Sequence, residues 1–304
     1  MLLSNALFSS SVLASALRLS TPLVFGSIGG CYTKKAGIFF IAYESLMLIS
    51  AFFSAWGSYT FGNPYIGMLC GIASALVTGL IFGILVLIFK ADSLIVSIAL
   101  NFGAWAITTQ LLVSVFKTRG SYFDPAIINY PTLHFKILEN SSWLNAVFND
   151  KVAIVYWAYI FVFISFIIIY KTAFGLRLRS IGINELASTS AGVNVNAHKW
   201  ASLVFLSVAL GIAGSYLPLS GVSMFSENMT AGRGNVCIAA VLVGNGNPLL
   251  TVLVALVFAY CSAIVPTLTT FSIPTQILAC IPYTFVILLF IANGIKNSLR
   301  KAEQ

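Results

Sequence analysis

Long apolar runs separated by short polar segments make up most of this 304-residue chain. A membrane-spanning helix needs about 20 predominantly apolar residues. Nine segments approach or exceed that length: 5–31, 38–60, 65–89, 93–116, 152–170, 200–222, 223–248, 249–266 and 275–295. Only 8% of the residues are charged and the mean hydropathy is +0.97, which leaves too little polar surface to cover a soluble globule. The pattern predicts an all-α integral membrane protein, a polytopic bundle of about 8–10 transmembrane helices, in a single domain over 1–304.

The segment 223–248 differs from the other runs because polar residues, glycines and a proline interrupt it. It contains Glu227 and Arg233, and Gly232 and Gly234 flank the arginine. Unwound backbone is tolerated at membrane depth only where protein buries it or where it lines a cavity, and discontinuous helices of this kind form transporter binding sites. We therefore expect at least one broken helix here, as a full crossing or as a re-entrant segment. A salt bridge between the two charges that only holds the fold is the alternative.

The distribution of Lys and Arg residues between the polar segments predicts the topology. If the basic C-terminal tail and the segment 171–199 lie in the cytoplasm, alternation puts 117–151 outside. Ten basic residues then fall in cytoplasmic segments and four in the external loop, as the positive-inside rule requires. The same alternation requires 223–248 to cross the membrane and places the N-terminus outside.

Glu44 and Asn101 are polar residues inside apolar runs. An ionised carboxylate at the bilayer centre costs about 2.5–3.5 kcal/mol on insertion scales, so such residues usually face the interior of a bundle or a water-filled path. Glu44 is therefore predicted to line a solute path or to fix a helix, and the alternative is a neutralised or internally paired acid with no transport role. For Asn101, a hydrogen bond between helices explains the residue as well as a solute contact does.

The residue types that carry enzyme or metal chemistry are scattered along the chain. The cysteines lie mostly within apolar runs without a C-x-x-C motif, and His134 and His198 lie in separate polar loops. The sequence contains no H-E-x-x-H motif, no Ser/His/Asp arrangement and no basic cluster interleaved with aromatic residues. We therefore expect no catalytic residue, metal site, cofactor or nucleic-acid partner, and an intramembrane enzyme is disfavoured.

The segment 171–199 is more elaborate than a simple connection between two spans. It opens with basic residues that suit a membrane surface. Residues 183–191 then predict a short helix, with Asn184 as its N-cap and Gly192 at its end. A short cytoplasmic helix between two spans is a natural contact for a soluble partner. An interfacial amphipathic helix without a partner is the alternative.

Three groups of motifs resemble a known family. They are Thr-Pro-Leu-Val-Phe-Gly-Ser-Ile-Gly-Gly (21–30) with Lys35-Ala-Gly-Ile and Glu44; Gly-Leu-Arg-Leu-Arg-Ser-Ile-Gly-Ile-Asn-Glu-Leu-Ala with Ala-Gly-Val-Asn-Val (175–195); and Phe-Ser-Glu-Asn-Met-Thr-Ala-Gly-Arg-Gly (225–234) with Ile238-Ala-Ala and Asn247-Pro248. Together they resemble bacterial ATP-binding cassette importer permeases of the ribose/branched-chain amino acid type. The third group is similar to the branch that imports nucleosides.

The resemblance implies a permease subunit of an ATP-driven importer in the bacterial cytoplasmic (inner) membrane, which translocates a nucleoside, with simple sugars as the alternative solute. It implies three protein partners within and beside the lipid bilayer: a second, related permease; a cytoplasmic ATP-binding cassette ATPase that uses the ATP; and an external solute-binding protein, in this branch often a lipoprotein, that meets the loop 117–151. The implied solute path is Glu44, Asn101, Glu227, Asn228 and Arg233. The implied ATPase coupling residues are Gly182, Asn184, Glu185, Ala187, Ala191, Gly192 and Val193.

The sequence departs from the family pattern in two places. The usual Val-Asn-Ile-Gly-x-Glu-Gly is Phe-Phe-Ile-Ala-Tyr-Glu-Ser here (39–45), so the Asn and both glycines are lost while the acid stays. Asn245-Gly246 replaces the usual basic–aromatic pair before Asn-Pro. Both changes bear on the solute more than on the transport class. The alternative class is an ion-coupled secondary transporter, in which Glu44 and Glu227 would take up protons or Na⁺.

Overall fold

A computed structural model of the chain describes residues 9–134, 142–269 and 284. The longer helices are α2 (Ser10–Lys35), α3 (Tyr43–Phe61), α4 (Pro64–Gly83), α5 (Ser93–Phe116), α7 (Ala153–Lys171), α10 (Val195–Leu219) and α12 (Pro248–Thr269). A π-helical turn, η1 (Ile84–Ile88), extends α4. The shorter helices are α6 (Ser142–Phe148), α8 (Ala173–Ile183), α9 (Glu185–Ser190) and α11 (Arg233–Val243). The strands are β1 (Ser121–Phe123), β2 (Thr132–Leu133), β3 (Lys151–Val152) and β4 (Met224–Ser226).

Six helices of the described residues are long and apolar enough to cross a membrane: α2, α4 with η1, α5, α7, α10 and α12. The peripheral ones expose large apolar side chains, such as Phe102 of α5 and Trp157 of α7, as lipid contact requires. Two further helices, the largely buried α3 and the short α11, complete this part of the bundle. The predicted all-α polytopic membrane protein is confirmed. The last predicted run, 275–295, falls outside the described residues except for Thr284.

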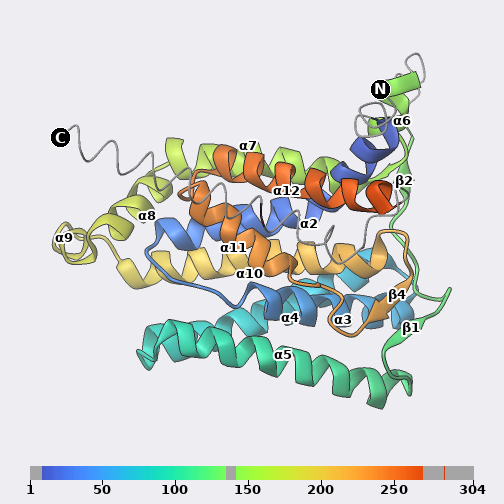
Figure 1. Cartoon of the computed structure of the whole chain (residues 1–304). Coiled ribbons are helices and arrows are strands. Elements are labelled where there is room, and N and C mark those ends of the chain that lie inside the picture. Colours follow the sequence, from blue (N-terminus) through green and yellow to red (C-terminus); the bar gives the residue numbers. More distant parts are fainter. Residues whose placement is uncertain (1–8, 135–141, 270–283, 285–304) are drawn as a thin grey trace.

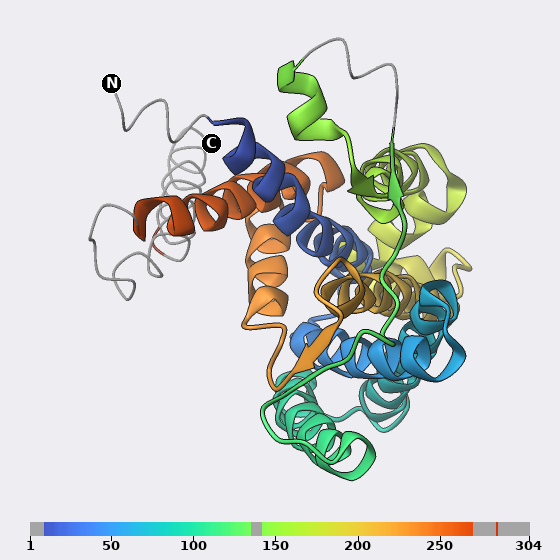
Figure 2. The same ribbon diagram turned by 90° about the vertical axis from the view of Figure 1, so that its right-hand side faces the viewer.

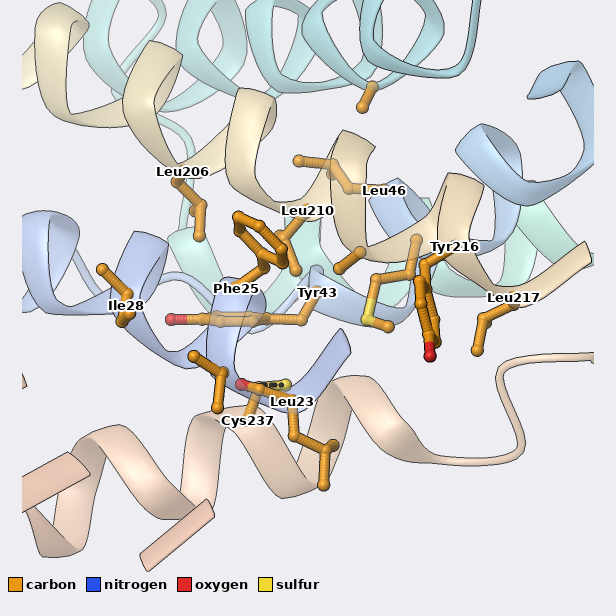
Figure 3. Packing of buried hydrophobic residues seen from close by; sticks show 14 of the residues in the cluster. Leu23, Phe25, Ile28, Tyr43, Leu46, Leu206, Leu210, Tyr216, Leu217 and Cys237 are labelled. Atoms are coloured by element: carbon orange, nitrogen blue, oxygen red, sulfur yellow. Dashed lines mark hydrogen bonds between the residues drawn. The ribbon is translucent and has the colours of Figure 1, made fainter. Parts of the chain in front are cut away.

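The centre of the bundle is built from α2, α3 and α10, with α5 at the edge (Figure 2). Side chains from these central helices and from α11 converge there, among them Phe25, Tyr43 and Cys237 (Figure 3). Glycines allow the backbones to approach. A Cβ on Gly214 would lie 2.3 Å from the carbonyl oxygen of Met47. Close packing over small residues is how membrane helices associate, and the structure confirms it for the small residues of the central helices.

The two ends of the bundle are built differently (Figure 1). At one end, here called the β end, β1 pairs antiparallel with β4 and β2 with β3, close to α6. At the opposite end, here called the α9 end, α8 and α9 project beyond the long helices. The described parts of the segment 117–151 therefore lie at the opposite end from the segment 171–199, as the predicted alternation across the membrane requires.

The second apolar run does not form a helix over its whole length. Residues 38–42 are not helical, and α3 begins only at Tyr43. Side chains of the neighbouring α5 satisfy this backbone: the Ser97 hydroxyl accepts from the N–H of Ile41 at 3.2 Å, and the Ser93 hydroxyl donates to the carbonyl of Phe39. Glu44, expected in the middle of a span, consequently lies in the first turn of a helix that starts inside the bundle.

The segment 223–248 connects the two ends in a broken crossing. It begins as β4 at the β end. It then passes through turns into α11. At the α9 end, the carbonyl of Asn245 accepts a hydrogen bond from the Lys35 ammonium group at 2.9 Å. With 11 residues, α11 is about 16 Å long, roughly half of a hydrocarbon core of about 30 Å. The remainder of the crossing is non-helical, as predicted.

Candidate functional site

Glu44 and Arg233, two of the residues predicted for the solute path, meet at the start of α11. The chain reaches this point through consecutive hydrogen-bonded turns over 226–233. Asn228, Ala231 and Gly232 have positive φ angles of 53°, 46° and 80°. Such angles strain most residues, but glycine adopts them freely, which suits Gly232 to the N-cap position. The N–H groups at the start of the helix have no partner within it and must be satisfied from outside.

The Glu44 side chain, half-buried in the first turn of α3, accepts the hydrogen bonds that the start of α11 offers. Its Oε1 accepts from the N–H of Gly232 at 2.8 Å and from the Thr230 hydroxyl. Its Oε2 accepts from the N–H of Gly234 at 2.8 Å. A helix N-terminus favours negative charge, and hydrogen bonds to a carboxylate are stronger than neutral ones. Glu44 therefore fixes α11 against α3, which is one of the two roles predicted for it. Lining the solute path stays a prediction.

Gly234 allows this contact because it has no side chain. A Cβ at this position would lie 2.6 Å from both the backbone nitrogen and the Oε2 of Glu44. We expect Gly234→Ala to displace α11, because the new methyl group would overlap the backbone of α3 at Glu44, which cannot easily move aside. The cost of about 1–3 kcal/mol should lower the unfolding temperature of the purified protein by about 5 °C, measured by thermal unfolding, and reduce uptake.

Gly103→Ala is the matched control for that substitution. Gly103 lies in α5, and a Cβ there would meet no atom within 4 Å. Alanine is the better helix former by about 1 kcal/mol, so this variant should unfold at the parent temperature or slightly above it. Indistinguishable unfolding temperatures for the two variants would contradict the close approach between α11 and Glu44.

Asn101 of α5 holds the start of α3 from the other side. Its Oδ1 accepts from the N–H of Ser45 at 3.0 Å, and its Nδ2 donates to the carbonyl of Ile41 at 3.4 Å. The amide thus satisfies backbone groups on either side of the first turn of α3. Ser45, to which Asn101 bonds, is the residue next to Glu44. This contact between α5 and α3 matches the predicted hydrogen bond between helices.

Glu227 lies toward the β end of the broken crossing. Its carboxylate accepts from the N–H of Gly120 at 2.9 Å, and its own N–H donates to the Gly120 carbonyl at 2.8 Å. Both contacts continue the β1–β4 pairing. In the same loop, hydrogen bonds from the Tyr122 hydroxyl and the Ala126 N–H lower the pKa of Asp124 below its ordinary value. Glu227 therefore anchors the broken crossing to the loop at the β end.

Arg233 and Asn228 occupy the turns between these two anchors. The Arg233 guanidinium donates to the carbonyls of Met229 and Thr230 at 3.1 and 3.2 Å. The Asn228 side chain is exposed. The structure thus brings Glu44 and Arg233 together at the start of α11, with Asn228 on the exposed turn beside them.

The α9 end has the helix predicted from 183–191. Asn184 is the N-cap of α9, and its Oδ1 accepts from the N–H of Ala187 at 3.1 Å. Gly192 has a φ of 79° and ends the helix, with the N–H of Val193 bonded to the carbonyl of Ser188 at 3.1 Å. The cap and stop signals were both correct. An additional helix, α8, precedes it.

Three further features define the shape of this end. Gly182 packs directly on α2: a Cβ there would lie 2.2 Å from the carbonyl oxygen of Lys35. The carboxylate of Glu185 pairs with Lys199 at 2.7 Å, and the N–H of Ala191 bonds to the carbonyl of Ala187, which closes α9. The side chains at the tip are apolar and highly exposed. Ile183 is 87% exposed and Leu186 is 81% exposed.

The partners of Glu44 were not apparent from the sequence. Thr230, Gly232 and Gly234 lie 186 to 190 residues away from it. The glycines beside Arg233 signalled unwound backbone, but two of the three donors are main-chain N–H groups, which carry no sequence signal. Among the described residues, His, Cys, Asp and Glu form no group of three that could hold a metal ion.

Comparisons with known proteins point in one direction. A family model described as "Branched-chain amino acid transport system / permease component" matches residues 12–292. The nucleoside ABC transporter permease protein NupC of Lactococcus lactis subsp. cremoris (strain MG1363) is 29% identical over 300 residues, 93% of each chain. NupB of the same strain, also named a nucleoside ABC transporter permease protein, is 24% identical over 310 residues, 98% of this chain and 84% of NupB. The guanosine ABC transporter permease protein NupQ of Bacillus subtilis (strain 168) is 26% identical over 270 residues, 84% of this chain and 82% of NupQ.

Proposed function

Because the chain belongs to the branched-chain amino acid transport system permease component family, we propose that it is the membrane-spanning permease subunit of an ATP-driven importer that translocates a nucleoside. The solute assignment is supported by the similarity, over most of the chain, to permeases named for nucleosides and guanosine. The structure adds a broken crossing whose helix α11 starts inside the bundle, which is the arrangement that transporter sites use. Polar groups of Glu44, Asn228 and Arg233 surround that start and are the residues we assign to the solute path.

The chain works as one half of a pore. NupB and NupC are two permeases of one strain, and each is similar to this chain, which supports a second, related permease as the partner. The projecting α9 is the contact for an ABC-type ATPase, which hydrolyses the ATP, so this chain contributes no catalytic residue. An external solute-binding lipoprotein delivers the nucleoside at the β end. There, the described parts of the segment 117–151 are hydrogen-bonded to the broken crossing through β1 and Gly120.

The orientation follows from the placement of the charges. At the α9 end lie the last turn of α2 with Lys34 and Lys35, the helix α8 with Arg177 and Arg179, and the connection from η1 to α5 with Lys90. This end faces the cytoplasm by the positive-inside rule. The β end faces outward. The protein is thus a multi-pass protein of the bacterial cytoplasmic (inner) membrane.

Uptake of labelled guanosine tests the proposal. Cells that lack their own nucleoside importers should accumulate guanosine when they express the chain with the ATPase and permease encoded beside its gene. Excess unlabelled nucleosides should compete for uptake, whereas ribose should not. Competition by ribose alone would assign a simple sugar instead.

The same assay separates the two transport classes. An uncoupler that collapses the proton gradient while ATP is maintained should leave uptake intact, because ATP hydrolysis drives the import. Uptake that stops with the gradient and needs no ATPase would show an ion-coupled secondary transporter.

A further inference from the structure

A cavity of about 550 Å³ opens at the α9 end, between the end of α2, the helix α8 and the turn that follows α11. Three cationic side chains line it: Lys34, Lys35 and Arg179. No carboxylate is among the described residues that line it. Three positive charges around one cavity repel each other, and an anion bound between them would offset this repulsion.

Lys35 and Arg179 are held by contacts with uncharged groups. Lys35 donates to the carbonyl of Asn245 at 2.9 Å. The Arg179 guanidinium lies 5.0 Å from the ring centre of Tyr170, and its Nε donates weakly to a backbone carbonyl at 3.4 Å. The side chain of Lys34 is exposed. These groups are therefore positioned around the cavity with donors to spare, because a guanidinium has five N–H bonds and an ammonium group three.

Part of the wall of the cavity is apolar. Phe39 is 53% exposed and Ile183 is 87% exposed, and both line the cavity. Tyr170 belongs to the last turn of α7, a helix that exposes Ile164 and Ile167 along its length. A small soluble anion would bind to the cationic side chains but would leave these apolar surfaces exposed to water. A ligand with a charged group and an attached hydrocarbon would cover both.

We propose that this cavity binds the phosphate group of an anionic phospholipid from the cytoplasmic leaflet. The proposal rests on the orientation given above, which places the α9 end in the cytoplasm. Anionic lipids are concentrated in that leaflet, and basic pockets between transmembrane helices bind their head groups. The phosphodiester accepts hydrogen bonds from Arg179 and Lys34, and the first carbons of the acyl chains lie against Phe39 and Ile183. The bound lipid then joins α2 to α8 and to the turn at Asn245.

Lipid titration of the assembled, full-length complex tests the site by native mass spectrometry. Phosphatidylglycerol should bind more tightly than phosphatidylcholine. Lys34→Gln and Arg179→Gln should each weaken phosphatidylglycerol binding about fivefold, and the double variant roughly 30-fold, as expected for one charge near an anionic surface. Lys90→Gln is the matched control, because Lys90 is a cation in the connection from η1 to α5 and does not line the cavity.

Three results would overturn the proposal. They are equal binding of both lipids, equal phosphatidylglycerol binding by the parent and the double variant, and displacement of the lipid by millimolar inorganic phosphate, which would assign the cavity to a soluble anion. Binding in detergent requires neither transport nor a known solute. A failed uptake assay would therefore contradict the proposed transport of guanosine, whereas a failed lipid titration would contradict only the lipid site.

Discussion

Replacing Glu44 with alanine should abolish uptake of the solute while the complex with its partner subunits still assembles. The substitution removes both oxygens that accept from Gly232 and Gly234 and from the Thr230 hydroxyl. Each N–H left unpaired away from water costs about 1–3 kcal/mol, and the negative charge at the start of α11 is lost as well. The start of α11 should then leave α3, and the path that it shapes should be lost. Uptake of labelled guanosine and co-purification of the subunits measure the two parts of this result.

Asp92→Ala is the matched control, because Asp92 is also a carboxylate that caps a helix. Its Oδ1 accepts from the N–H groups of Leu94 and Ile95 at the start of the peripheral α5. Loss of this cap should cost about 1 kcal/mol and leave uptake near the parent level. If Glu44→Ala instead fails to assemble, the carboxylate holds the fold and has no role in the path. Parent-like uptake would remove it from both roles.

Replacing Leu186 with aspartate should abolish uptake just as completely, by a different route. Leu186 lies at the tip of α9, and its side chain is 81% exposed. An exposed apolar side chain on a projecting helix is typical of a contact site, and a charge buried in that contact would be unpaired. The variant should insert normally into the membrane, fail to co-purify the ATPase, and leave the ATPase activity unresponsive to solute.

Val222→Asp is the control for this experiment. Val222 is also an exposed apolar residue, 43% exposed, but it precedes β4 at the β end. Its variant should co-purify the ATPase at the parent level. Normal ATPase binding by Leu186→Asp would mean that α9 is an interfacial helix without this partner, which is the alternative that the sequence left open.

Local signals in the sequence predicted most of the fold. The apolar runs 65–89, 93–116, 152–170 and 249–266 form helices within three residues of their expected bounds, because length and hydropathy largely determine a membrane span. Asn184 and Gly192 marked the ends of α9 because a side-chain cap and a positive φ angle each need particular residue types. The extra helix α8 was missed, since its residues combine basic and apolar side chains that also suit a membrane surface.

The contacts of the site could not be predicted in the same way. Glu44 was singled out for its charge, but its donors are mostly main-chain N–H groups, which every non-proline residue has. The early residues of its run, 38–42, are as apolar as a helix would be. They are held in a non-helical path by the side chains of Ser93, Ser97 and Asn101 from another helix. Such long-range capping leaves no periodicity in either segment.

The pairing of β1 with β4 couples the loop at the β end to the start of α11. Ser226 of β4 and Arg233 of α11 are separated by seven residue steps, and three successive turns already take up this length: the N–H of Met229 bonds to Ser226, that of Ala231 to Asn228, and that of Arg233 to Thr230. The connection therefore lengthens only if one of these hydrogen-bonded turns opens. A displacement of the β1–β4 pair by a few ångströms therefore reaches the start of α11 unless one of these turns breaks. The hydrogen bonds of these turns thus set the stiffness of the coupling between the surface loop and the start of α11.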